Sequence, residues 1–216
     1  MNIELKNVSK SFKKNEVLKD INLTLKEGTI YGFVGRNGSG KTVLLKLICG
    51  YFEPTTGEIL FNGKILNKEL KYPLSTRALI ESPRFLPMLT GYQNLELLAN
   101  IQKIIGKEEI EKTLKDVNLY EAKDKKYHTY SLGMKQKLGI AQVLMENPSV
   151  IILDEPFNGV EKESADKIRK LLLEEKNKGK TILIATHIKE DIESLCEEIY
   201  EVENGNIKKT INNFCQ

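Results

Sequence analysis

One eight-residue segment constrains the fold of this chain more than any other. It reads Gly35, Arg36, Asn37, Gly38, Ser39, Gly40, Lys41 and Thr42. The segment fits the pattern G-x-x-x-x-G-K-[ST], which requires a strand before it and a helix after it. An apolar run over residues 29–34 predicts the strand, and the pattern over residues 41–48 predicts the helix. The segment therefore predicts a loop whose backbone N–H groups surround phosphate groups at the positive end of a helix.

The last two residues of this loop predict the rest of a nucleotide site. Lys41 supplies a positive charge to the β- and γ-phosphates, and Thr42 supplies a hydroxyl to Mg²⁺. We expect the cofactors to be ATP and Mg²⁺. A guanine nucleotide is not expected, because the Asn-Lys-x-Asp guanine motif is absent and residues 67–70 do not complete it.

Acidic and imidazole side chains follow two further apolar strands. Asp154 and Glu155 come directly after the run over residues 150–153, and His187 follows the run over residues 181–185. Ligands of a parallel sheet bind at the carboxyl ends of its strands. We expect Asp154 to hold Mg²⁺, Glu155 to orient or deprotonate the attacking water, and His187 to bond the γ-phosphate and that water.

The order of the elements predicts an α/β fold. Residues 2–10 and 17–26 alternate apolar and polar side chains, which predicts half-buried strands of an antiparallel sheet. Apolar strands alternating with helices predict a parallel α/β core. The predicted helices are residues 41–48, 91–118, 131–146, 161–178 and 189–197, and further strands are predicted at residues 58–61 and 77–80.

The helices in the middle of the chain interrupt this alternation and predict a second lobe. We expect one ATP-binding domain over residues 1–216, with a catalytic lobe at about residues 1–81 and 148–216. The helical lobe is expected at about residues 82–147.

Charge and composition exclude several classes of protein. The formal net charge is +3, so no nucleic-acid partner is expected. No run approaches the roughly 20 apolar residues that span a bilayer, so a pore would have to come from another chain. The three cysteines are far apart and show no metal-type spacing, which favours a reducing compartment.

A motif of seven residues completes a resemblance to a known family. It reads Tyr130, Ser131, Leu132, Gly133, Met134, Lys135 and Gln136. It resembles the signature of the nucleotide-binding subunits of ABC transporters, which usually reads Leu-Ser-Gly-Gly-Gln. It lies between the phosphate loop and the acidic residues Asp154 and Glu155, in the family's order. The resemblance covers essentially the whole chain.

The resemblance implies a fold, a mechanism and partners. The fold is a P-loop NTPase (RecA-like) core with an N-terminal antiparallel β subdomain and a helical subdomain. Two subunits, identical or different, sandwich two ATP molecules, and Ser131 and Gly133 of one subunit bind the nucleotide of the other. Phe12 matches the aromatic residue that stacks on adenine. Transmembrane permease subunits would hold the dimer at the cytoplasmic face of the cell membrane.

Two positions depart from the family's pattern. Glu81 stands where the family usually has a glutamine that senses Mg²⁺ and the attacking water, and its carboxylate can still bind either one. With Ser82 and Pro83 it resembles the exporter branch that gives bacitracin resistance and lantibiotic immunity. Glu161 stands where an aspartate usually contacts the dimer partner. The expected catalytic group is Glu155, His187, Lys41 and Glu81.

Two other functions remain open from the sequence. ABC-type ATPases also serve iron–sulfur assembly, repair and translation, and Glu81 and Glu161 leave room for a nucleotide-binding structural subunit without turnover. For a transporter, apolar side chains such as Phe85 and Met88 suggest that residues 83–92 receive a permease helix.

Overall fold

The computed structural model describes residues 1–73 and 75–210. Its strands are β1 (Ile3–Phe12), β2 (Asn15–Leu25), β3 (Ile30–Val34), β4 (Thr56–Phe61), β5 (Lys64–Ile65), β6 (Thr76–Leu79), β7 (Val150–Asp154), β8 (Thr181–Thr186), β9 (Glu198–Glu203) and β10 (Asn206–Thr210). Its α-helices are α1 (Lys41–Ile48), α2 (Gly91–Gln102), α3 (Lys107–Asp116), α4 (Leu132–Leu144), α5 (Lys162–Asn177) and α6 (Lys189–Leu195).

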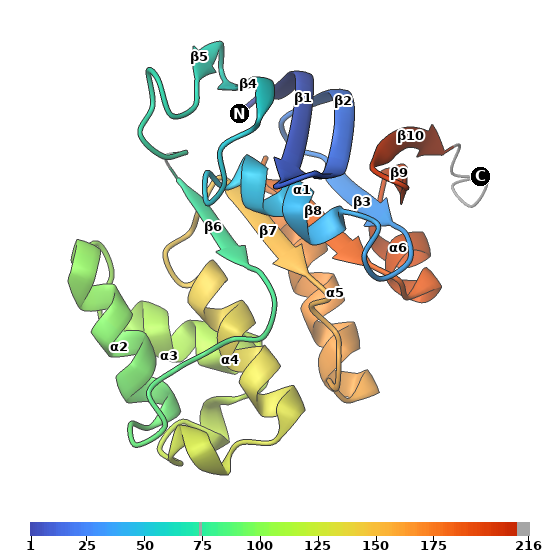
Figure 1. Cartoon of the computed structure of the whole chain (residues 1–216). Coiled ribbons are helices and arrows are strands. Elements are labelled where there is room, and N and C mark those ends of the chain that lie inside the picture. The colour runs from blue at the N-terminus through green and yellow to red at the C-terminus, as the bar shows by residue number, and fades with distance from the viewer. Residues whose placement is uncertain (74, 211–216) are drawn as a thin grey trace.

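The strands form two sheets, as Figure 1 shows. The first has the order β2-β1-β4-β5 and is antiparallel, as the alternating N-terminal pattern predicts. The second has the order β10-β9-β3-β8-β7-β6, and all its neighbours pair in parallel except β10 with β9. The α/β P-loop NTPase fold expected from the sequence is therefore confirmed.

The central strands are apolar throughout because both of their faces are covered. Alternate side chains of β8 enter different cores: Leu183 packs with the antiparallel sheet and α1, whereas Ile182 packs with the helices on the other face. Helix α1 lies between the two sheets and makes contacts with β2, β7 and β8. This packing fixes the helix that follows the phosphate loop.

The chain leaves the second sheet after β6 and returns to it as β7. The segment between them contains α2, α3 and α4, which lie together below β6 in Figure 1. A buried group that includes Leu95, Ile110 and Leu138 joins these helices to the core of the sheet. Helix α4 packs against β6 and β7, so the helical segment rests on the strands that carry Glu81 and Glu155.

One predicted helix is wrong in its length. Residues 91–118 form two helices, because α2 ends at Gln102 and its C-cap Lys103 has a left-handed backbone with φ 56°. Ile101 at the end of α2 and Ile104 just after it are 74% and 60% exposed. The sequence patterns also missed the edge strands β5 and β10 and the strand β9 next to β10.

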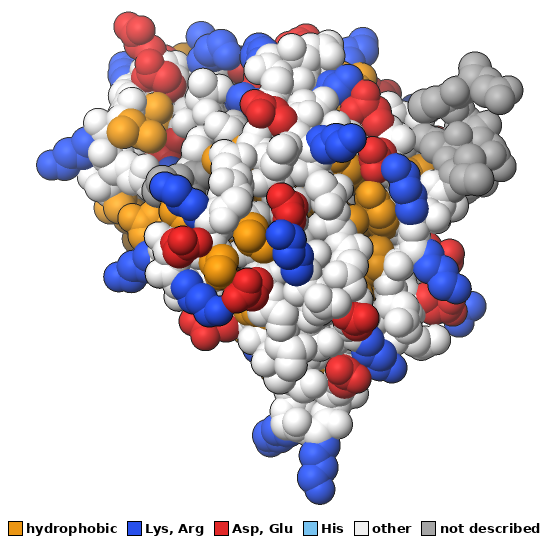
Figure 2. All heavy atoms as spheres, turned by 90° about the horizontal axis from the view of Figure 1, so that it is seen from above, with side chains coloured by type: hydrophobic (Ala, Val, Ile, Leu, Met, Phe, Trp, Pro, Cys, Tyr) orange, Lys and Arg blue, Asp and Glu red, His pale blue; other side chains and the backbone are white. Residues whose placement is uncertain are grey.

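The described residues contain no helix with the length and apolar character of a membrane span. Cys49 is a free thiol, and burial raises the pKa of the Cys196 thiol to about 12. Cys215 lies outside the described residues. Figure 2 shows that basic and acidic side chains are interspersed on the face seen from above.

Candidate functional site

The phosphate loop joins the end of β3 to the start of α1. A Cβ on Gly35 would lie 2.2 Å from the carbonyl oxygen of Val202, so only glycine fits there. Gly40 adopts φ 112° and begins α1. Lys41 Nζ lies inside the loop and donates to the carbonyl oxygens of Gly35 at 2.6 Å and Arg36 at 3.1 Å. The backbone carbonyl oxygens of the loop therefore hold the Lys41 ammonium group in place.

The Ser39 hydroxyl supports a phosphate site in this loop. It is buried and has no hydrogen-bond partner among the described residues. A buried hydroxyl without a partner is costly, and a phosphate oxygen at the start of α1 would satisfy it. Arg36 and Asn37 are exposed on the rim of the loop.

A pair of oxygen ligands lies at the start of α1. Thr42 Oγ1 donates to Asp154 Oδ2 at 2.7 Å, so the two expected Mg²⁺ residues meet. Burial raises the pKa of Asp154, and the Thr42 hydroxyl opposes that rise. A hydroxyl beside a desolvated carboxylate is the donor set that Mg²⁺ prefers, so the residues fit this ion.

Glu155 is held by contacts at both its side chain and its backbone. Thr186 Oγ1 donates to Glu155 Oε2 at 3.1 Å, and His187 Nδ1 lies 2.8 Å from Glu155 Oε1. Its backbone is left-handed with φ 48°, a conformation that costs energy outside glycine and asparagine. Gln136 Nε2 donates to the Glu155 carbonyl oxygen at 3.0 Å and helps to fix this turn.

Lys41, Thr42, Asp154 and Glu155 line one cavity of about 360 Å³, whereas Gly35, Arg36, Ser39 and His187 line an adjoining cavity of about 650 Å³. The lining of the first cavity is Phe12, Val17, Asn37, Gly38, Gly40, Lys41, Thr42, Val43, Asp154 and Glu155. Phe12 is 40% exposed and contacts Phe52 edge-on, with ring centroids 5.3 Å apart. A half-exposed ring at the mouth of a cavity beside the phosphate loop is available to stack on a base.

Glu81 adjoins this cavity through its backbone. Its backbone N–H faces the Asp154 carboxylate and opposes the rise in the Asp154 pKa that burial causes. Its side chain points elsewhere and accepts a hydrogen bond from Lys46 Nζ at 2.6 Å. The structure thus places Glu81 next to the expected metal ligands Thr42 and Asp154, with its carboxylate held by Lys46.

The signature residues lie outside the lining of this cavity. Ser131 is the N-cap of α4, is exposed, and accepts a hydrogen bond from Met134 N at 3.2 Å. Gly133 is buried against the backbone of Gly159. The structure brings the other expected site residues together and leaves Ser131 and Gly133 apart from them.

Comparison with known proteins assigns the family. The family model described as "ABC transporter" matches residues 18–158 of this chain. The uncharacterized ABC transporter ATP-binding protein YybJ of Bacillus subtilis (strain 168) is 40% identical over 206 residues, 95% of this chain and 94% of YybJ. The chain belongs to the ABC transporter family.

Further comparisons agree with this assignment. The bacitracin transport ATP-binding protein BcrA of Enterococcus faecalis is 38% identical over 213 residues, 97% of this chain and 69% of BcrA. The lantibiotic transport ATP-binding protein SrtF of Streptococcus pyogenes is 30% identical over 205 residues, 95% of this chain and 88% of SrtF. The relatives thus include the exporter branch that Glu81 suggested.

Solved structures show the same fold. An ATP-binding subunit of an ABC transporter matches with a TM-score of 0.86 and 29% identity, over 97% of this chain and 90% of the other. The dimeric bacterial cassette MJ0796 matches with a TM-score of 0.86 and 26% identity, over 98% and 99%. This ABC transporter subunit binds and hydrolyses ATP, and the alternative of a subunit without turnover is not supported.

Sequence reasoning missed three residues around the site of this ABC transporter subunit. They are Lys46, Gln136 and Thr186, which bond Glu81 or Glu155. Only Lys46 had a usable signal, because it lies four residues after Thr42 and so on the same face of a helix.

The contact between Gly133 and Gly159 gives a first prediction. A Cβ on Gly133 would lie 2.3 Å from the Gly159 carbonyl oxygen, so Gly133→Ala must displace backbone. We expect a loss of about 1–3 kcal/mol in the free energy of unfolding, measured by urea denaturation. The control is Gly106→Ala, whose added Cβ would approach only Glu109 Oε2, at 3.7 Å. Equal stability of the two variants would contradict the prediction.

Proposed function

We propose that the chain pairs head to tail with a second ATP-binding subunit and, through separate permease subunits, drives export of a peptide antibiotic. The observation that carries the pairing is the separation of Ser131 and Gly133 from the cavity that contains Lys41 and Glu155. Each chain then supplies half of two sites. The dimeric cassette and the bacitracin and lantibiotic relatives support this proposal.

We propose the following roles at the site. Residues 35–42 bind the phosphates of ATP, and Phe12 stacks on adenine. Mg²⁺ is bound by Thr42, Asp154 and Glu81. When bound, Mg²⁺ would neutralise charge that develops on the phosphate oxygens.

The proposed hydrolysis depends on Glu155 as the base. Glu155 accepts a proton from the attacking water at its carboxylate, which Thr186 and His187 hold in position. His187 also bonds the γ-phosphate, and Lys41 stabilises the charge on the β- and γ-oxygens. The proposed catalytic lobe covers residues 1–81 and 148–216, and the helical lobe covers residues 82–147.

A groove of about 870 Å³ supports a site for the permease. Its lining includes Tyr51, Tyr72, Ile101 and Ile104, which are 72%, 61%, 74% and 60% exposed. Apolar side chains gathered in an exposed groove of an ABC transporter subunit favour a cytoplasmic segment of the permease as their partner. We propose that this contact holds the subunit at the cytoplasmic face of the membrane.

The groove competes with the site expected at residues 83–92. Phe85 in that segment is half-buried and contacts Tyr127 edge-on, with ring centroids 5.3 Å apart. Met88 is 68% exposed but does not line the groove. The two locations can be separated by experiment.

The test is resistance in cells that express the chain with a permease of the bacitracin or lantibiotic type. We expect Ile101→Asp with Ile104→Asp to abolish resistance and co-purification with the permease, because a charge in an apolar contact is costly to bury. ATP binding should remain. The matched control is Met88→Asp, which should keep resistance. Loss of resistance only with Met88→Asp would place the permease at residues 83–92, and no resistance with the unaltered chain would contradict antibiotic export.

A further inference from the structure

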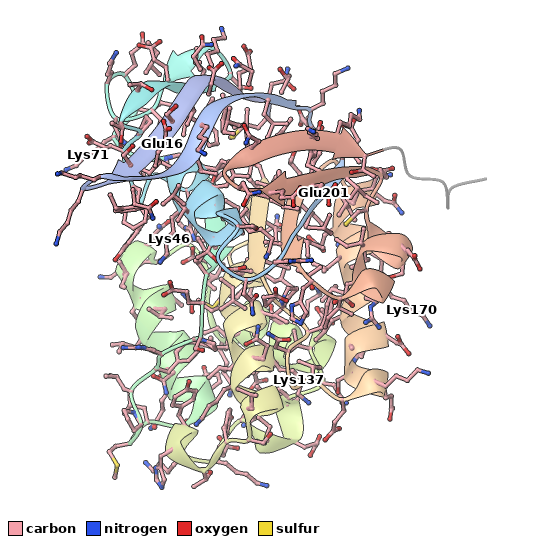
Figure 3. All side chains as sticks on the ribbon, turned by 45° about the vertical axis from the view of Figure 1, so that its right-hand side comes forward. Glu16, Lys46, Lys71, Lys137, Lys170 and Glu201 are labelled. Atoms are coloured by element: carbon pink, nitrogen blue, oxygen red, sulfur yellow. The ribbon has the colours of Figure 1, made fainter. Side chains whose placement is uncertain are left out.

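Lys46 and Glu81 form an ion pair beside the metal ligands. Lys46 Nζ lies 2.6 Å from Glu81 Oε1, and the Lys46 side chain is 17% exposed while that of Glu81 is 64% exposed. The lysine is positioned on its other side by aromatic rings, with Nζ 5.7 Å from the Tyr51 centroid and 5.5 Å from the Phe52 centroid. Figure 3 labels Lys46 on α1. The lysine is thus fixed, and the glutamate is the partner that is free to move.

The position of Lys46 along α1 relates it directly to the metal site. Thr42, which bonds Asp154, lies four residues earlier on the same helix and therefore on the same face, about 6 Å away along the axis. The backbone N–H of Glu81 faces the Asp154 carboxylate, so the Glu81 backbone lies near both positions. Rotation of the Glu81 side chain can carry its carboxylate from Lys46 to the Thr42–Asp154 pair without movement of the strand.

A glutamine at position 81 could not be held in this way. A neutral amide forms no ion pair with Lys46, whereas the carboxylate is attracted both by the lysine and by a divalent cation. The two attractions compete for one carboxylate, because it can occupy only one of the two positions at a time.

We infer that Lys46 is a positioning residue that holds the Glu81 carboxylate away from the metal ligands until a divalent cation arrives with the nucleotide. The ion pair stabilises the chain without metal and so raises the Mg²⁺ concentration needed to load the site. Its effect is several-fold, since one partner is largely exposed. This inference rests on the proposed role of Glu81 toward Mg²⁺.

The experiment is a double-mutant cycle on the full chain. The quantity measured is the Mg²⁺ concentration that gives half-saturation of binding of a non-hydrolysable ATP analogue, by equilibrium dialysis, normalised to binding in EDTA. We expect Lys46→Gln to lower this concentration about fivefold and Glu81→Gln to raise it. Lys46→Arg, which keeps the charge, should restore the unaltered value. In the Glu81→Gln background, Lys46→Gln should have a much smaller effect.

The cycle separates this inference from the proposed function. If Glu81→Gln changes the Mg²⁺ dependence but Lys46→Gln does not, the inference is overturned and the role of Glu81 stands. An equal effect of Lys46→Gln in both backgrounds also overturns it, because simple repulsion between Lys46 and Mg²⁺ would then explain the result. If Glu81→Gln has no effect, both the inference and the proposed metal role of Glu81 fail.

Discussion

A Glu155→Gln variant is expected to lose about 10²–10⁴-fold in ATP turnover while it still binds ATP. The amide keeps the size of the side chain and can still bond Thr186, but it cannot accept a proton from water. The measurement is phosphate release across a range of protein concentrations, alongside light scattering with ATP. We expect the variant to accumulate as a dimer, because ATP is bound and not consumed.

The unaltered chain provides the comparison for this result. Its turnover should rise faster than linearly with protein concentration if two chains complete each site. A Glu155→Gln variant with turnover within tenfold of the unaltered chain would remove Glu155 from the role of base. His187→Ala, tested in parallel, should lower turnover less, because Thr186 would still bond the Glu155 carboxylate that His187 also contacts.

A Lys41→Ala variant is expected to bind ATP about 30-fold more weakly or worse. Lys41 is 6% exposed, and removal of one partner from a buried, hydrogen-bonded charge pair costs about 2–5 kcal/mol. The measurement is the dissociation constant of ATP by equilibrium dialysis. The matched control is Lys64→Ala, because Lys64 is exposed on β5, outside the lining of the nucleotide cavity.

Thermal unfolding without nucleotide completes this test. Lys41 also donates hydrogen bonds to the carbonyl oxygens of Gly35 and Arg36, so a fall in Tm would show whether the alanine loosens the loop itself. Unchanged ATP affinity in a folded Lys41→Ala variant would contradict the assignment of residues 35–42 as the phosphate site.

Much of the core fold could be predicted because its signals are local. The apolar runs of β3, β7 and β8 are buried on both faces, and the phosphate-loop pattern itself requires a strand and a helix. The strands β9 and β10 were missed because charged residues interrupt the apolar positions of both strands. The break between α2 and α3 was missed because Lys103 gives no sign of a left-handed backbone.

The site could be predicted where one residue type suits one task. Thr42, Asp154, Glu155 and His187 lie at the carboxyl edge of the parallel sheet, and topology alone brings them together. Gln136 and Thr186 could not be predicted, because their roles depend on contacts with the Glu155 carbonyl and carboxylate that no spacing encodes.

The position of α1 between the two sheets has a consequence for how the molecule opens. Leu44, Leu45, Leu47 and Ile48 are fully buried, so the amides of this helix should be exposed to solvent only when the whole chain unfolds. The exposed end of α2 lacks such packing and can open at a lower free energy. The chain therefore has partly open states in which the phosphate loop keeps its shape, and nucleotide can bind to these states and shift the balance among them.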